Sequence, residues 1–244
     1  MLHIEQIDNR IIMYDTDMER FNNVWRDYFD LDTDYNSIKT YLLSKDDKLK
    51  EAITEKNGIR ILKQDFFETL MSFIISQNKQ IPHIKKIVLD LCTAYGKPVG
   101  SYGGKVYYSF PQPDELRNVT EEDYKALKTG FRARYLKDAV DKVLSGEIKY
   151  DMFVDYDCIK CEKVLTSITG VGMKVANCVM LFGLNKRDAF PVDVWIKRIM
   201  EQLYFGKDTD KEVIKKFAKE QFGEYGGYAQ QYLFFYARDL GKTN

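Results

Sequence analysis

The sequence has no excess of charge, no long apolar run and few cysteines. Its 37 lysines and arginines equal its 37 aspartates and glutamates, so the net charge at pH 7 is zero. Any nucleic-acid binding therefore needs a local basic surface rather than a chain-wide positive field. No apolar run approaches the roughly 20 residues of a membrane span, and residues 1–6 lack a signal-peptide pattern. We expect a cytoplasmic protein with no membrane association.

Cysteine usage excludes several classes of site. The chain has four cysteines, of which Cys158 and Cys161 form a lone CxxC pair with no second pair at zinc-binding spacing. So few cysteines fit a reducing compartment. We therefore expect neither a catalytic metal nor a cofactor.

The remaining composition favours a folded, mainly helical protein. The 244 residues are 45% hydrophobic and 14% aromatic, enough for a sizeable core. Residues 3–14 alternate loosely and predict one or two strands, whereas the apolar spacing in residues 21–29 predicts one stripe of a helix. We divide the chain into a small β region at 1–16 and a helical domain at 17–244.

Capping residues and prolines predict where helices begin. Asp32, Thr33 and Asp34 are candidate N-caps for a helix to about Leu42, Asp65 can cap a helix to about Ile75, and Pro82 suits the start of another. The glycine- and proline-containing segment 97–112 predicts a loop or a short hairpin. Further helices are expected near 192–205, 209–222 and 226–240.

Residues 165–178, LTSITGVGMKVANC, predict two helices joined by a tight turn. Gly170 and Gly172, on either side of Val171, predict positive φ angles and a close backbone approach. The amides of such a turn, with the positive end of the following helix, can bind a DNA phosphate. A plain interhelical turn with two convenient glycines is an equally good interpretation of these residues alone.

Lys174 is expected in the first turn of the second helix. A cation there opposes the helix dipole, and this field, with apolar neighbours, favours the free amine. A free amine can attack the C1′ atom of a deoxyribose and form a Schiff base. The alternative is a solvated lysine that contacts a phosphate.

Asp193 follows Lys174 by nineteen residues and is expected at the start of a further helix, after Pro191. An anion beside the sugar would stabilise the positive charge that develops at C1′ as a base leaves, and would orient the lysine. An ordinary N-cap is the alternative, and the two roles are compatible. Cys178 lies one helical turn after Lys174, where a buried structural cysteine is the simpler interpretation.

These motifs resemble the helix-hairpin-helix DNA glycosylase superfamily, in particular its 8-oxoguanine DNA glycosylase branch. The resemblance extends from about residue 24 to residue 240. It includes residues 65–81, similar to the helix before the strand-probing loop, and residues 129–135, similar to the wedge loop. Residues 227–234 resemble the helix that forms the base pocket. The resemblance implies two helical lobes with a DNA-binding cleft between them.

The resemblance also implies roles for individual residues in this chain. It makes Lys174 the nucleophile and Asp193 its carboxylate partner. It places the extruded base between Cys178 and Phe234, with Gln230 bonded to the Watson–Crick edge of that base. Without the family, Phe234 is interpreted as core packing and Gln230 as a solvated helix residue.

A second group of residues is implied to contact the base left behind in the duplex. Asn78 would fill the vacated space, Arg132 would contact the estranged cytosine, and Phe131 would wedge beside it. Physics is consistent with such a group, because extruding a base costs a few kcal/mol that a wedge and a polar filler partly offset. Helix capping and a surface ion pair are the alternatives for Asn78 and Arg132.

Three departures from the family pattern are visible. The N-terminal glycine whose carbonyl recognises 8-oxoguanine is not found, and the N-terminal β region is interpreted as truncated. His83 stands where a second cytosine-contacting arginine is expected, which predicts a weaker preference for cytosine. Trp195 stands at the position of a phosphate-contacting histidine and either donates its N–H or packs.

The sequence therefore predicts a monomeric bifunctional DNA glycosylase and AP lyase that excises 8-oxoguanine from double-stranded DNA. It would be nucleoid-associated in a bacterium and nuclear in a eukaryote. Alternatives are a glycosylase of the same fold for another damaged base, a non-catalytic helix-hairpin-helix DNA-binding module, and a helical protein–protein adaptor. The lysine argues against the monofunctional branches, which use water and the aspartate alone.

Overall fold

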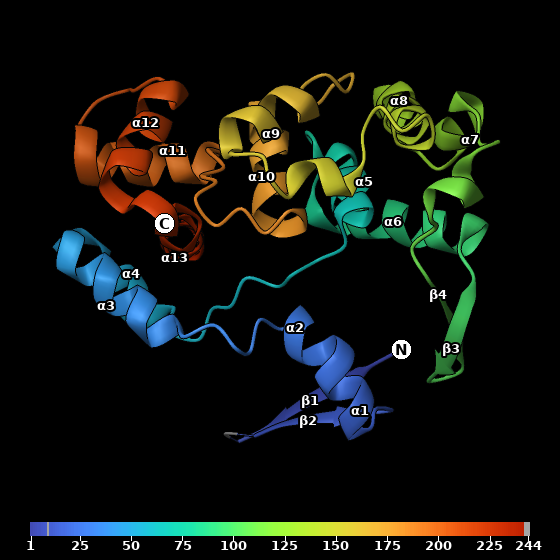
Figure 1. Cartoon of the computed structure of the whole chain (residues 1–244), viewed down its shortest axis with the longest axis horizontal. Coiled ribbons are helices and arrows are strands. Elements are labelled where there is room, and N and C mark those ends of the chain that lie inside the picture. Colours follow the sequence, from blue (N-terminus) through green and yellow to red (C-terminus); the bar gives the residue numbers. More distant parts are fainter. Residues whose placement is uncertain (9, 242–244) are drawn as a thin grey trace.

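The N-terminal residues form a small sheet beside a helical body (Figure 1). A computed structural model describes residues 1–8 and 10–241. The strands β1 (His3–Ile7) and β2 (Arg10–Tyr14) are antiparallel, with His3 opposite Tyr14 and their rings stacked at 4.9 Å. Ile11 is 66% exposed, so this sheet contributes little to the core.

A helical run follows the sheet directly. It consists of α1 (Met18–Arg20), the π-helical turn η1 (Phe21–Trp25) and α2 (Arg26–Tyr28). Its aromatic residues pack together as the sequence predicts, with Trp25 and Tyr28 meeting edge to face at 6.0 Å. The single apolar stripe predicted for residues 21–29 fails at Val24, which is 46% exposed and lies in the π-helical turn, where the helical phase shifts.

Of the three candidate caps at 32–34, Asp34 is the one used, and the cap predicted at Asp65 is confirmed. Asp34 accepts hydrogen bonds from the first turn of α3 (Tyr35–Lys45), and Asp65 accepts one from Glu68 N in α5 (Phe66–Ser76). Each cap satisfies backbone donors that a helix start leaves unpaired. The sequence signals therefore set where these helices begin.

The remaining helices complete the body of the protein. They are η2 (Asp47–Leu49), α4 (Lys50–Glu55), α6 (Ile81–Tyr95), η3 (Pro113–Leu116), α7 (Glu121–Ala126), η4 (Gly130–Arg132), α8 (Ala133–Leu144), η5 (Tyr150–Phe153), α9 (Cys158–Leu165), α10 (Met173–Gly183), α11 (Val194–Met200), η6 (Glu201–Phe205), α12 (Lys211–Phe222), η7 (Gly223–Tyr225) and α13 (Gly226–Leu240). None of the helices within residues 1–8 and 10–241 is long and apolar enough to cross a bilayer.

The segment 97–112 contains a hairpin, which resolves the two possibilities left by the sequence. Its strands are β3 (Pro98–Tyr102) and β4 (Lys105–Tyr108), joined at Gly103 and Gly104. Both glycines have positive φ, as a tight two-residue hairpin requires. The ring of Tyr102 lies 4.6 Å from that of His3, so this hairpin contacts the N-terminal sheet.

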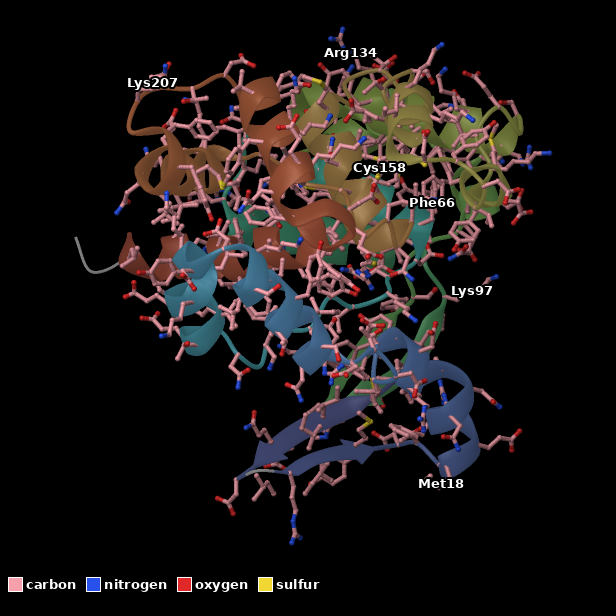
Figure 2. The ribbon with its side chains drawn as sticks, turned by 60° about the vertical axis from the view of Figure 1, so that its left-hand side comes forward. Met18, Phe66, Lys97, Arg134, Cys158 and Lys207 are labelled. Carbon is pink, nitrogen blue, oxygen red and sulfur yellow. The ribbon has the colours of Figure 1, made fainter. Side chains whose placement is uncertain are left out.

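The helices form two groups that meet near the centre of the molecule (Figure 1). α4, α11 and α12 pack against α13, and α3 packs against α12, whereas α5 packs against α6, α8 and α10. The crossing of α5 and α10 is close, because a Cβ atom on Gly183 would lie 3.0 Å from Thr69 Cβ. Arg134, next to the start of α8, lies on the side of the body away from Met18 (Figure 2). The close crossing of α5 and α10 fixes the position of α10, whose first turn carries Lys174.

Candidate active site

The predicted helix-hairpin-helix is present, with α9 and α10 joined by residues 166–172. Gly170 has a φ of +77°, and a Cβ atom on it would lie 2.3 Å from the ring of Tyr135. The positive φ predicted for this glycine is therefore confirmed, whereas the close neighbour is a side-chain ring and not the backbone that was predicted. The prediction for Gly172 is wrong, because its φ is −88° and nothing lies within 4 Å of a Cβ placed there. One left-handed residue is enough to reverse the chain in this turn.

Gly172 has a different use, as the N-cap of α10. It supplies no side-chain hydrogen bond to the helix, so the first amides of α10 are not capped by their own N-cap residue. Val171 is buried, and its amide donates to Ile168 O at 3.0 Å, which holds the turn against the core. Uncapped amides at the positive end of a helix can bind an anion such as a phosphate.

Lys174 is the second residue of α10, in the first turn as predicted. The side chain is half-buried, and its Nζ atom lies 5.3 Å from the centre of the Phe73 ring on α5. Phe73 in turn stacks on Phe182 of α10 at 5.7 Å. The amine therefore lies along the α5–α10 interface.

Asp193 is the N-cap of α11, where its Oδ1 accepts from Ile196 N at 2.9 Å. The preceding Pro191 and Val192 are buried and anchor this end of the helix. The capping interpretation is thus confirmed for Asp193. Capping uses one carboxylate oxygen and leaves the charge of the group available to other partners.

Cys178 connects the two charged groups. Burial raises the pKa of its thiol to about 11, the nearby Lys174 ammonium lowers it, and the Asp193 carboxylate raises it. The thiol therefore stays protonated at neutral pH. Cys178 is buried one turn after Lys174 on α10, and the charges of Lys174 and Asp193 both act on its thiol.

Gln230 lies on α13 beside the segment that leads to Asp193. It is buried, and its Nε2 donates to Pro191 O at 3.1 Å, while its Oε1 accepts from Gln231 Nε2 at 2.6 Å. The interpretation as a solvated residue is therefore wrong. Phe234 is half-buried one turn later, and the Arg238 guanidinium lies 5.5 Å from its ring centre. The base-sandwiching role of Phe234 stays a prediction.

The residues predicted to contact the unpaired base lie after α5 and before α8. Asn78 is exposed and has a φ of +46°, and His83 is exposed in the first turn of α6. Phe131 is 54% exposed, as a wedge requires. Arg132 is instead buried and donates to Gln77 O and, at 3.2 Å, to Thr129 O. Contact between Arg132 and a cytosine therefore needs a change of side-chain conformation, and that role stays a prediction.

The indole of Trp195 packs against neighbouring residues. A Cβ atom on Gly241 would lie 2.4 Å from the indole, and the Arg198 guanidinium lies 5.7 Å from the ring centre. The indole is thus fixed between the end of α13 and an exposed arginine of α11. Of the two uses predicted for this residue, packing is the one the contacts support.

Sequence reasoning missed Phe73, which touches the Lys174 amine, and Tyr135, which touches Gly170. Both contacts join helices that are far apart in the chain. Tyr135 ends the predicted wedge segment, so its position was visible, but nothing local indicates what it contacts. In the sequence, nothing distinguishes Phe73 from the other apolar residues of α5.

A helix-hairpin-helix with a lysine and an aspartate at successive helix starts is the arrangement expected of a base excision DNA repair protein. Comparison with known families agrees with this assignment. The model described as HhH-GPD superfamily base excision DNA repair protein matches residues 71–222. That of the 8-oxoguanine DNA glycosylase N-terminal domain matches residues 1–70. The chain therefore belongs to the HhH-GPD superfamily, and within it to the 8-oxoguanine DNA glycosylase branch.

Individual relatives agree with that placement. The Clostridium acetobutylicum 8-oxoguanine glycosylase/lyase, solved in complex with dsDNA containing cytosine opposite to 8-oxoG, is 44% identical, with a TM-score of 0.93 over 98% of this chain and 82% of that one. A probable N-glycosylase/DNA lyase of Methanothermobacter thermautotrophicus is 30% identical over 87% of this chain and 73% of its own length. The N-glycosylase/DNA lyase of Saccharomyces cerevisiae is 30% identical over 89% of this chain and 66% of its own length.

Proposed function

We propose that this protein is a bifunctional DNA glycosylase and AP lyase that removes 8-oxoguanine from duplex DNA. The observation that carries the proposal is the placement of Lys174 in the first turn of α10, one turn before the buried Cys178, and of Asp193 at the N-cap of α11. An amine, a carboxylate and an apolar wall for a base are the groups that covalent base excision needs. The names of the relatives support 8-oxoguanine as the damaged base.

The first chemical step replaces the base by the enzyme. The free amine of Lys174 attacks C1′ of the extruded nucleotide and forms a C–N bond, while the glycosidic bond breaks and the base leaves with the bonding electron pair and takes up a proton. Positive charge develops on the sugar as the base leaves. The Asp193 carboxylate stabilises that charge, a contribution worth about 10²–10³ in rate for one preorganised group.

The second step cuts the strand. The attached amine loses one proton, and the C1′–O4′ bond then breaks with its electron pair going to O4′, which takes up a proton. The product is a protonated Schiff base between Lys174 and C1′. This cation acidifies the C2′ hydrogen, so a proton leaves C2′ and the C3′–O bond breaks. The 3′ phosphate departs with that bonding pair, and the strand is nicked 3′ to the lesion. Hydrolysis of the Schiff base then restores Lys174.

The other residues supply recognition in this proposal. Cys178 and Phe234 flank the extruded base and Gln230 bonds its Watson–Crick edge, which requires Gln230 to exchange its bond to Pro191 O for one to the base. Asn78 and Phe131 occupy the gap in the duplex. The hairpin, residues 170–172, binds a phosphate. The enzyme acts as a monomer wherever the genome lies, in the nucleoid of a bacterium or the nucleus of a eukaryote.

Borohydride trapping tests the proposal directly, because reduction of the Schiff base makes the protein–DNA bond permanent. We expect a covalent adduct with a duplex that contains 8-oxoguanine and none with the matched undamaged duplex. Running the lesion opposite each of the four bases measures the preference for cytosine, which the histidine at position 83 predicts to be weak. An adduct with other damaged bases but none with 8-oxoguanine would move the substrate to another lesion.

Replacing Asp193 with asparagine separates its two roles. Asparagine caps helices as well as aspartate does, so we expect the melting temperature to change little. The charge beside the sugar is lost, so single-turnover excision should slow by about 10²–10³. Asp210, which caps α12 through Glu212 N at 2.8 Å, is the matched control, and Asp210→Asn should excise at the parent rate. Equal rates for both variants would assign Asp193 to capping alone.

A further inference from the structure

The helix α8 touches the wedge and the hairpin through the same side chain. The ring of Tyr135 meets Phe131 edge to face at 5.7 Å. The same ring also contacts Gly170, whose absent side chain leaves room for it. Arg134 stacks over Tyr135 at 5.0 Å and donates to its hydroxyl at 3.3 Å, which restricts the ring further. A single aromatic side chain thus lies between the proposed wedge and the proposed phosphate-binding turn.

One helical turn further, α8 binds the hairpin by a charge-assisted hydrogen bond. The Asp138 carboxylate accepts from Thr169 N at 2.7 Å, and these residues are 31 positions apart in the chain. Bonds of an ionised acceptor are shorter and stronger than neutral ones. The carboxylate also places negative charge next to a turn that would bind a phosphate, which by itself disfavours DNA.

The same end of α8 is attached to the loop before α6. The buried Arg132 guanidinium donates to the backbone carbonyl of Gln77, the residue before Asn78. The three segments that would meet DNA are therefore joined: the loop at Asn78 to the wedge through Arg132, and the wedge to the hairpin through Tyr135 and Asp138.

We propose that Tyr135 and Asp138 are positioning residues that hold the wedge and the hairpin at a fixed spacing. This inference rests on the proposed function. A base can be extruded only if the wedge enters the stack while the turn holds the backbone, so the distance between the two sets the kink in the DNA. Misplacement by about 1 Å costs up to about a hundredfold in rate.

Asp138→Ala tests this role because it removes the bond to Thr169 without touching a residue that meets DNA. We expect single-turnover excision of 8-oxoguanine to slow by about tenfold. The fluorescence of a 2-aminopurine placed beside the lesion should show a matching loss of base extrusion. Asp138→Asn keeps an acceptor oxygen and should restore the rate to within about twofold of the parent. If Asp138 contributes only repulsion, both variants should bind DNA more tightly and excise at least as fast.

A double-mutant cycle with Phe131→Ala distinguishes positioning from a general loss of stability. Once the wedge is absent its spacing no longer matters, so Asp138→Ala should cost less than about twofold in that background. The same tenfold loss in both backgrounds overturns the proposal. Asp141→Ala is the matched control on α8, because Asp141 pairs only with the surface Lys137 at 2.5 Å among the contacts of the described residues.

Trapping on a duplex that already contains an abasic site keeps this test separate from the proposed function. Parent and Asp138→Ala should both trap there, since no base has to be extruded. No adduct with either protein means that the proposed function fails, and the positioning role with it. If Asp138→Ala melts below the assay temperature, Tyr135→Leu provides the same comparisons, and a parent-like rate for that variant overturns the proposal.

Discussion

Lys174→Gln is expected to abolish borohydride trapping and to slow strand cleavage by about a thousandfold or more. Glutamine has no basic amine, so neither the bond to C1′ nor the Schiff base can form. Its length is similar and it suits a helix, so we expect α10 and its packing on Phe73 to be kept. The measurements are the covalent adduct and the nicked strand, each with a lesion duplex under single-turnover conditions.

Lys163→Gln is the matched control, because Lys163 is an exposed lysine on α9, the other helix of the same hairpin motif. It should trap and cleave at the parent level. Binding to undamaged duplex, measured over a range of salt, should be nearly equal for the two variants. A Lys174→Gln protein that still forms the adduct would mean that another amine is the nucleophile.

The second large effect is expected for Gly170→Ala. An L-residue in the left-handed conformation costs about 1–2 kcal/mol, and forcing a methyl group into the ring of Tyr135 costs about 1–3 kcal/mol. We therefore expect the free energy of unfolding to fall by about 2–5 kcal/mol, and the melting temperature by about 5–15 °C. DNA affinity should fall as well, because the turn that would hold the phosphate is displaced.

Gly172→Ala is the natural comparison, two residues away in the same turn. Its φ is −88° and the space around it is open, so alanine fits there, and the loss of a glycine N-cap costs less than about 1 kcal/mol. Thermal melting of both variants provides the measurement. Equal destabilisation by the two substitutions would contradict the conformation described for the turn.

Much of the fold could be predicted because its signals are local. Asp34 and Asp65 cap helices in the structure as they do in the sequence pattern, and Lys174 and Asp193 both occupy helix starts. Caps depend on a few consecutive residues and on backbone donors that every helix leaves unpaired. Local signals thus predict the positions of Lys174 and Asp193 at helix starts, while the roles in catalysis follow from the family resemblance.

The remaining features depend on contacts between distant segments. Nothing near Gln230 indicates that it bonds to Pro191 O, 39 residues away. The sequence likewise does not indicate that the Arg132 side chain is buried, since an arginine in a loop is ordinarily solvated. At the hairpin, the sequence predicts positive φ for both glycines, and it does not indicate that Gly170 contacts a ring on another helix.

In the proposed mechanism, the groups that bind the phosphate, attack the sugar and contact the base all lie along the helix α10. Gly172, the N-cap of α10, and Cys178, whose sulfur borders the predicted pocket, are six residues apart. This separation corresponds to about 9 Å of helix rise, and Lys174 lies between the two residues. That length is comparable to the reach from a backbone phosphate across a sugar to its base. In the proposed mechanism, a nucleotide whose phosphate is bound beside Gly172 therefore has its anomeric carbon near Lys174 and its base near Cys178.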